Sequence, residues 1–456
     1  MVHLKGAKGN TRTVSRSSTE SNDVLGSRVE TSGAKRNTGV SVAGARPLHG
    51  LLPSLFAILV SVFHPGSSPA SDEAALQPRE QLGKYVFFDT RLSAPEGQSC
   101  AACHGAEVGF TGPDGEINRA GAAYEGAVKG RFGNRKPPTS SYGGNSPVLH
   151  FDKDEKVWVG GMFWDGRATG KRMKDPLAEQ AQGPFLNPLE QNFPDAESVC
   201  MKIKGSSYAS LFERVWGKAS LDCAKNVAAT YDRIARSIAA YERSKEANPF
   251  SSKYDDFLRK KVRLSDEEMQ GLALFEGRGK CAECHPSKRG PKGEFPLFTD
   301  FTYDNLGIPK NPKNPFYRMP AEWNPEGSAF VDTGLGGFLK EAGYKRSQHE
   351  PEMGKFKVPT LRNVDKRPTP GFVKAFGHNG YFKSLNEIVH FYNTRDVLGS
   401  CEKKGEPRLG TNCWPEPEVA SNLNRKQLGD LRLTQKEEEA IVAFLGTLSD
   451  GYATGE

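Results

Sequence analysis

Two copies of a Cys-x-x-Cys-His motif are the residues of this chain best suited to chemistry, at residues 100–104 and 281–285. This spacing is typical of c-type haem attachment, in which two thiols bond to the porphyrin and the histidine ligates iron. The alternatives are a redox Cys-x-x-Cys pair and a zinc site, but zinc would need both pairs close together. We therefore expect two covalently bound haem c groups. The residues expected to hold them are Cys100, Cys103, Cys281 and Cys284, with His104 and His285 as iron ligands.

A short amphipathic helix is predicted before each motif, over residues 81–88 and residues 270–275. The second helix has a clear start signal, since Ser265 can act as its N-cap and Glu268 can close a capping box. These helices would deliver the chain directly into the haem-binding turns.

A longer helix is predicted to close each half, over residues 226–244 and 434–448, where apolar residues recur at helical spacing. Helix, haem motif, loops and closing helix form the plan of a cytochrome c domain. The expected fold is mainly α, with two cytochrome c-like helical domains, long ordered loops and little strand. We place the N-terminal domain at 71–250 and the C-terminal domain at 251–456, with the boundary near 246–261.

The sequence between the two Cys-x-x-Cys-His motifs is rich in proline and glycine. Residues 134–139 (Asn-Arg-Lys-Pro-Pro-Thr) and 183–188 (Gly-Pro-Phe-Leu-Asn-Pro) are predicted to be neither regular helix nor central strand. Long ordered loops in a compact domain are usually functional. We expect these two to wrap the haem edges and to build a distal pocket.

The N-terminal 70 residues differ from the rest in charge. They hold eight Lys or Arg and three Asp or Glu, a net charge of +5 of the chain's total of +7. The apolar run 51–63 is too short to span a bilayer, follows Arg46 and precedes small residues at 66–70, as in a signal peptide cleaved near residue 70. Residues 1–45 are expected to be disordered. The prediction is export to the periplasm, with an uncleaved membrane anchor as the alternative. No basic stripe favours nucleic-acid binding.

Four cysteines remain outside the haem motifs, in two local pairs. In an oxidising compartment they are expected to form the disulfides Cys200–Cys223 and Cys401–Cys413, with free buried thiols as the alternative.

Further motifs follow in a fixed order, and with them residues 75–450 resemble the bacterial dihaem cytochrome c peroxidase and MauG superfamily. The motifs are Phe-Trp-Asp-Gly-Arg-Ala at 163–168, the segment 179–190, Phe-Lys-Val-Pro-Thr-Leu-Arg-Asn-Val at 356–364, and His-Asn-Gly at 378–380 leading into 384–392.

The resemblance implies an N-terminal haem that reacts with peroxide and a C-terminal haem that stores or relays an electron. Trp164 would lie between the haems, Glu190 would be the distal acid, and Gln180 and Pro184 would shape the distal pocket. A carboxylate above an open iron can take a proton from one peroxide oxygen and give it to the other. The alternatives are a core tryptophan and a solvated loop glutamate.

Two departures from the ordinary peroxidases are visible. Residues 105–149 contain no histidine, so we expect the first haem to be open, with His150 as a displaced cap in the alternative.

Where those peroxidases carry a methionine ligand to the second haem, this chain has Tyr392, as the MauG-like branch does. A phenolate would favour ferric iron, where methionine would favour ferrous iron. His390 is a competitor, but residues i and i+2 of a helix face different sides. A core aromatic is the other interpretation of Tyr392.

The resemblance favours an exported enzyme that uses hydrogen peroxide to oxidise an aromatic residue of a partner protein by long-range electron transfer. MauG has a tryptophan as exit relay where this chain has Gly279, which leaves Trp323 and Trp414 as candidates. The alternatives are a peroxidase that reduces peroxide with electrons from a small redox protein, and a non-catalytic electron carrier. Family members often bind calcium through an asparagine that is replaced here by Lys136, so no calcium ligands are assigned.

Overall fold

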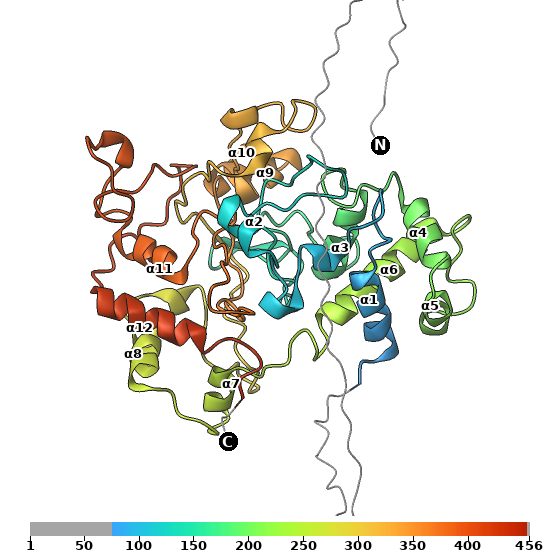
Figure 1. The fold of residues 1–456 in the computed structure, drawn as a ribbon, viewed down its shortest axis with the longest axis horizontal. Coiled ribbons are helices and arrows are strands. Elements are labelled where there is room, and N and C mark those ends of the chain that lie inside the picture. Colours follow the sequence, from blue (N-terminus) through green and yellow to red (C-terminus); the bar gives the residue numbers. More distant parts are fainter. Residues whose placement is uncertain (1–74, 454–456) are drawn as a thin grey trace, which may run out of the picture. The chain divides into compact units, whose positions relative to one another are not determined.

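Helices supply most of the regular structure in the computed structural model, which describes residues 75–453 (Figure 1). The expected signal peptide and the polar N-terminal segment lie outside these residues. Strands are few and short, as predicted. They form two antiparallel pairs, β1 (His150–Asp152) with β2 (Val157–Val159) and β3 (Tyr303–Asp304) with β4 (Phe356–Lys357). Within the described part of the chain, no helix is long and apolar enough to cross a membrane.

Twelve α-helices connect through long loops in the described residues. They are α1 (Pro78–Phe88), α2 (Gly115–Ala120), α3 (Pro176–Leu186), α4 (Ala196–Lys204), α5 (Ala209–Trp216), α6 (Val227–Glu242), α7 (Lys253–Leu258), α8 (Asp266–Glu276), α9 (Gly334–Glu341), α10 (Arg346–His349), α11 (Leu385–Thr394) and α12 (Gln435–Gly446). The short 3-10 helices are η1 (Cys100–Ala102), η2 (Ala106–Val108), η3 (Cys281–Glu283), η4 (Pro315–Arg318), η5 (Gly327–Ala329), η6 (Glu350–Glu352) and η7 (Cys401–Lys403).

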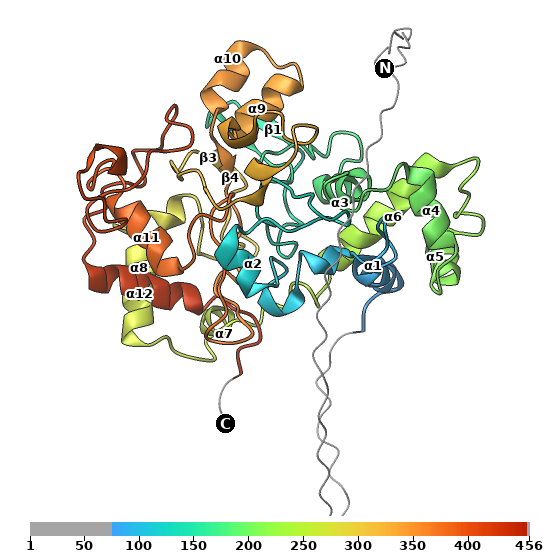
Figure 2. The same cartoon turned by 45° about the horizontal axis from the view of Figure 1, so that its top comes forward.

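The four helices predicted around the haem motifs are all present, and they pair in the same way in both halves. Helix α1 packs on α6, and α8 packs on α12 (Figures 1 and 2). Each pair meets at a glycine. A Cβ atom on Gly83 would lie 1.9 Å from the carbonyl oxygen of Ser237, and a Cβ atom on Gly271 would lie 1.9 Å from that of Ala440. No larger residue fits either contact, so the two helix pairs share one packing geometry.

Replacing Gly271 with alanine is therefore expected to lower the free energy of unfolding by about 1–3 kcal/mol, the usual cost of overpacking. Thermal unfolding followed by circular dichroism measures it. Gly446 is the matched control on α12, because an added Cβ there meets no atom within 4 Å. Gly446→Ala should leave stability equal or slightly higher, since glycine is a poorer helix former than alanine. Equal losses in the two variants would contradict the close contact.

Apolar side chains gather in two main clusters, one drawn from residues 82–247 and the other from residues 254–448. The first surrounds α1, α3, α4 and α6, and the second surrounds α7, α8, α11 and α12. Residues 75–453 nevertheless belong to one compact unit. The division into two domains remains a prediction.

The interpretation of residues 183–188 as non-helical was wrong, because α3 runs through Gly183 and Pro184 to Leu186. Pro184 stands in the last turn of the helix, where its missing N–H removes one hydrogen bond and little helix follows. The start of α3 is well fixed, since the Asp175 carboxylate accepts hydrogen bonds from two backbone amides and Pro176 follows it. Residues 134–139 contain no helix or strand, as expected.

Both predicted disulfides are confirmed. Cys200–Cys223 ties α4 to the segment that precedes α6, and Cys401–Cys413 closes the exposed loop between α11 and α12. The predicted capping box of Ser265 and Glu268 is also present at the start of α8.

Candidate active site

Each Cys-x-x-Cys-His motif forms a tight turn that aims its histidine in the same way. In the first motif the ring Nδ1 of His104 lies 3.1 Å from the carbonyl oxygen of Phe110. In the second the Nδ1 of His285 lies 2.7 Å from that of Phe298. When Nδ1 donates its proton to this carbonyl, Nε2 keeps a free lone pair for a metal. Burial lowers the pKa of His104 to about 4, which also favours the neutral, ligating imidazole.

The first motif lines a cavity of about 180 Å³, which also contains the other residues predicted for the peroxide site. Helix α3 contributes Gln180 and Pro184, and the turn after it contributes Glu190. The lining residues named in advance are Cys100, Cys103, His104, Trp164, Gln180, Pro184 and Glu190. His104 is the only histidine among the residues that line this cavity, and no methionine lines it.

Glu190 is a partly buried carboxyl group in the wall of the first cavity. Burial raises its pKa, while Arg167 and Asn187 oppose that shift. Its backbone is fixed, because its N–H donates to the carbonyl of Asn187 at 3.0 Å and its own carbonyl accepts from Ala127 at 2.7 Å. A carboxyl group with a raised pKa near a reaction centre is suited both to accept and to donate a proton.

Trp164 is buried and lines both cavities, so its indole ring forms part of the wall between them. Its Nε1 donates to the carbonyl of Lys136 at 3.0 Å, and its own carbonyl accepts from the N–H of Lys357 at 2.8 Å. The following residue, Asp165, forms a 2.6 Å ion pair with the partly buried Arg135. These contacts hold the indole in one orientation.

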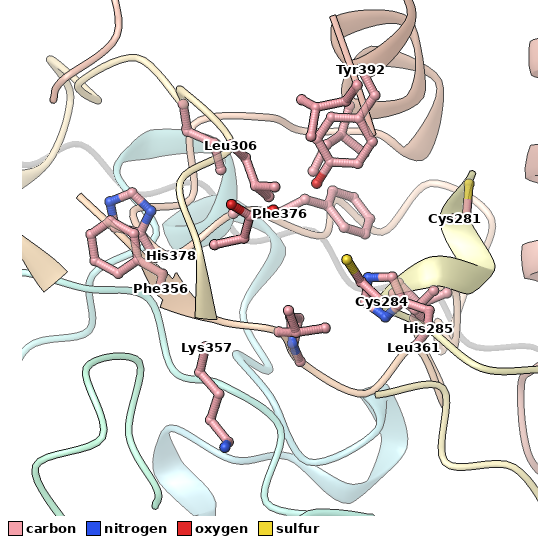
Figure 3. A pocket seen from close by; sticks show the side chains of 18 of the residues that line it. Cys281, Cys284, His285, Leu306, Phe356, Lys357, Leu361, Phe376, His378 and Tyr392 are labelled. Atoms are coloured by element: carbon pink, nitrogen blue, oxygen red, sulfur yellow. The ribbon is translucent and has the colours of Figure 1, made fainter. Parts of the chain in front are cut away.

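The second motif lines another cavity, of about 230 Å³, together with Tyr392. Figure 3 shows Tyr392 extending from α11 with its phenol oxygen directed toward the space beside Cys284 and His285. Burial raises the pKa of Tyr392, so its ionisation needs a nearby cation such as a metal. The residues named in advance for this site are Cys281, Cys284, His285 and Tyr392, and all four line the cavity.

His390 is engaged elsewhere and does not line the second cavity. Its Nδ1 lies 3.0 Å from the carboxylate of Glu438, and its Nε2 lies 2.9 Å from the carbonyl of Gly410. His150 is exposed on β1, with Nδ1 2.9 Å from the carbonyl of Val148, and lines neither cavity. Neither histidine is placed to compete with the predicted ligands.

Several buried polar atoms around both cavities have no hydrogen-bond partner in the protein, which is uncommon in folded proteins. In the first cavity these are Gln98 Oε1, both amide atoms of Gln191 and Glu242 Oε2. In the second they are both ring nitrogens of His378, which stacks on Phe356 (Figure 3), and Glu418 Oε2. Largely apolar cavities with a fixed histidine, two thiols and unpartnered polar groups fit a haem each.

Two charged residues, one partly buried and one buried, were not expected in these walls from the sequence. Lys136 lines both cavities, and its ammonium donates to Thr111 Oγ1 at 3.1 Å and to the carbonyl of Pro137 at 3.0 Å. Burial lowers the pKa of Lys136 to about 8. Glu242 is the other, at the end of α6. Across residues 75–453, no group of three or more His, Cys, Asp or Glu side chains is placed to hold a metal ion.

Two Cys-x-x-Cys-His cavities, one with a distal carboxyl group, define a class of protein, the two-haem c-type oxidoreductases. The family model described as di-haem cytochrome c peroxidase matches residues 77–263. The chain is 35% identical over 385 residues to the methylamine utilization protein MauG of Paracoccus denitrificans, across 84% of this chain and 90% of that protein. It is 30% identical over 312 residues to the cytochrome c551 peroxidase of Nitrosomonas europaea, across 68% of this chain and 71% of that protein.

The crystal structure of the diheme peroxidase BthA from Burkholderia thailandensis has the same fold. Its TM-score is 0.66 at 30% identity, across 83% of this chain and 87% of that one. The chain belongs to the di-haem cytochrome c peroxidase and MauG family. It is a haem-dependent oxidoreductase, and its family implies two haem c groups, hydrogen peroxide and a protein partner or electron donor.

Proposed function

We propose that this enzyme uses hydrogen peroxide at an open first haem site to oxidise an aromatic residue of a partner protein by long-range electron transfer. The observation that carries the proposal is the asymmetry of the two cavities. The first has Glu190 and no second histidine or methionine in its wall, whereas Tyr392 faces the second. One site is thus suited to admit peroxide and the other to retain oxidising equivalents.

The residues of the first site perform the proton chemistry. Cys100 and Cys103 would attach the haem and His104 would ligate its iron through Nε2. When bound, the haem supplies an iron centre that accepts oxidising equivalents from peroxide. Glu190 would accept a proton from one peroxide oxygen and donate it to the other, departing oxygen. Two electrons from the partner and two further protons then complete the reduction of one peroxide to two waters.

Trp164 is proposed to connect the two sites, because it alone of the tryptophans lines both cavities. From the second site an aromatic series leads outward. The ring of Tyr392 lies 6.2 Å from Phe391, which lies 5.1 Å from Trp414. Trp414 is buried and follows the exposed residues 402–409 in the chain. Trp323 instead stacks under Arg131 at the surface, so Trp414 is the favoured exit toward a docked protein.

The finer organisation is proposed on the same basis. We infer two cytochrome c-like domains, 71–250 and 251–456, each centred on one helix pair with its haem motif. Export to the periplasm follows from the c-type haem motifs and the apolar run at 51–63. The Lys136 ammonium supplies a buried positive charge at the position of the family's calcium-binding asparagine, so calcium is not required in this proposal.

The alternative is reduction of peroxide with electrons from a small redox protein, and the similarity to a cytochrome c551 peroxidase favours it. Spectra of the as-isolated, fully oxidised protein separate the two functions. We expect one high-spin and one low-spin haem, a lasting absorption change on adding peroxide without prior reduction, and oxidation of a Trp- or Tyr-bearing partner. His150→Ala, which changes an exposed residue, should behave as the parent protein. If turnover requires a half-reduced protein, the alternative is correct.

A further inference from the structure

The helical walls of the two cavities correspond residue by residue, and at one position the first cavity has a charged residue where the second has an apolar one. When the two glycine contacts are superposed, α1 matches α8 and α6 matches α12. Phe87 then corresponds to Phe275 and Ile238 to Ile441, and all four line their cavities. The next wall position is Glu242 in the first cavity and Leu445 in the second. A carboxyl group therefore stands where the fold otherwise places an apolar side chain.

Glu242 is almost fully buried, with 3% of its surface exposed. The Ser140 side chain favours the ionised form and so opposes the rise in the pKa of Glu242, while Oε2 has no hydrogen-bond partner in the protein. A buried carboxyl oxygen without a partner is costly, so it needs a compensating role. Both Glu242 and Ser140 line the first cavity, beside Cys100.

In the part of the chain that the structure describes, no cation forms an ion pair with Glu242, although several line the same cavity. Arg243 follows it in the chain, but its guanidinium is paired with the carboxylate of Asp175 at 2.7 Å. Three other cations line the same cavity. Arg135 and Arg167 are paired with Asp165, and the Lys136 ammonium donates to Thr111 and to the carbonyl of Pro137. Cys100 and Glu190, which also line it, carry no positive charge. Burial consequently raises the pKa of Glu242 to about 8, close enough to neutrality for a change of nearby charge to alter its protonation.

We propose that Glu242 is a redox-linked proton site of the first haem. Its carboxylate binds one proton from solvent when the iron in this cavity gains one electron, and releases that proton when the electron leaves. The direction follows from charge, because a reduced iron is one unit less positive and stabilises a nearby carboxylate less. Leu445 cannot do this in the second cavity. The inference needs a haem bound at His104, but it depends neither on peroxide nor on the identity of the partner.

The reduction potential of each haem in the two-haem protein, measured against pH by spectroelectrochemistry, tests the proposal. The potential of the first haem is expected to fall as pH rises, with a slope approaching about 59 mV for each tenfold fall in proton concentration. Glu242→Gln keeps the shape and removes the titration, and should abolish this slope. A carboxylic acid C=O band should also appear in the reduced-minus-oxidised infrared difference spectrum and vanish in the variant.

The variant Glu242→Leu copies the second cavity and should give the same flat profile, and Leu445→Gln is the matched control that should leave the first haem's slope intact. If Glu242→Leu fails to fold or to bind haem, Glu242→Gln still decides the result. An unchanged slope and infrared band in Glu242→Gln would overturn the proposal. So would a slope that disappears only in Glu190→Gln, which would assign the proton to the distal carboxyl group. Failure of partner oxidation would leave these potentials unaffected.

Discussion

Replacing Glu190 with glutamine is expected to slow the reaction of the oxidised protein with hydrogen peroxide by about 100- to 10,000-fold, the usual contribution of a positioned acid–base group. Glutamine keeps the size and polarity of the side chain but cannot accept a proton. In this variant the side chain at position 190 could not transfer a proton from one peroxide oxygen to the other. Stopped-flow absorption, with peroxide in excess, gives the second-order rate constant directly.

The pH dependence of the rate with peroxide provides a second test of the role of Glu190. Burial raises the pKa of Glu190 above its ordinary value, and the ionised form is the one that accepts the peroxide proton. The rate should therefore increase as pH rises through that raised pKa in the parent protein, and this step should be absent in Glu190→Gln. Glu197→Gln, an exposed carboxyl on α4 outside the cavity, is the control and should react at the parental rate. A loss smaller than about threefold would remove Glu190 from the proton path.

The local features of the site could be predicted from the sequence because they depend on residues close together in the chain. The Cys-x-x-Cys-His turns are short, and the helices around them have start signals such as Ser265 and Glu268 that act within one turn. The prediction that Pro184 lies outside a helix was wrong because it also considered only the nearest residues. Proline is not expected in the interior of a helix, so without a known helix start Pro184 indicates a break. Asp175 and Pro176 begin α3 early enough that Pro184 lies in its last turn.

The features that could not be predicted depend on packing between distant segments. In the sequence Glu242 is one polar residue near the end of a helix, and only the folded structure shows that it lines a cavity, where the second cavity has Leu445. The backbone carbonyl of Lys136 likewise accepts a hydrogen bond from Trp164, 28 residues further on. His390 was set aside by helical geometry alone, but its actual partner, the carboxylate of Glu438, lies 48 residues away. Burial of a charge is a tertiary property, so the chain order does not show it.

Replacing Tyr392 with phenylalanine is expected to remove the oxygen that we propose as a ligand of the second haem, while keeping the ring that packs against Phe391. The low-spin electron paramagnetic resonance signal of the oxidised protein should change, because the phenol oxygen that would hold the iron together with His285 is lost. The reduction potential of that haem should rise by at least about 59 mV, a tenfold shift toward the ferrous form, since an anionic oxygen donor favours ferric iron. Tyr381→Phe is the control, because Tyr381 lies just before α11 and does not line the cavity.

The companion variant Tyr392→Met separates the two functions that the family allows. A thioether raises the potential further than loss of the ligand alone, because it stabilises ferrous iron. The second site would then accept electrons from a small donor protein more readily and retain oxidising equivalents less well. Partner oxidation should fall by more than tenfold while the first-step rate with peroxide, governed by Glu190 in the other cavity, stays within about twofold of the parent. An unchanged low-spin signal in both variants would exclude Tyr392 as a ligand, and equal losses of both rates would show that the two cavities do not divide the reaction.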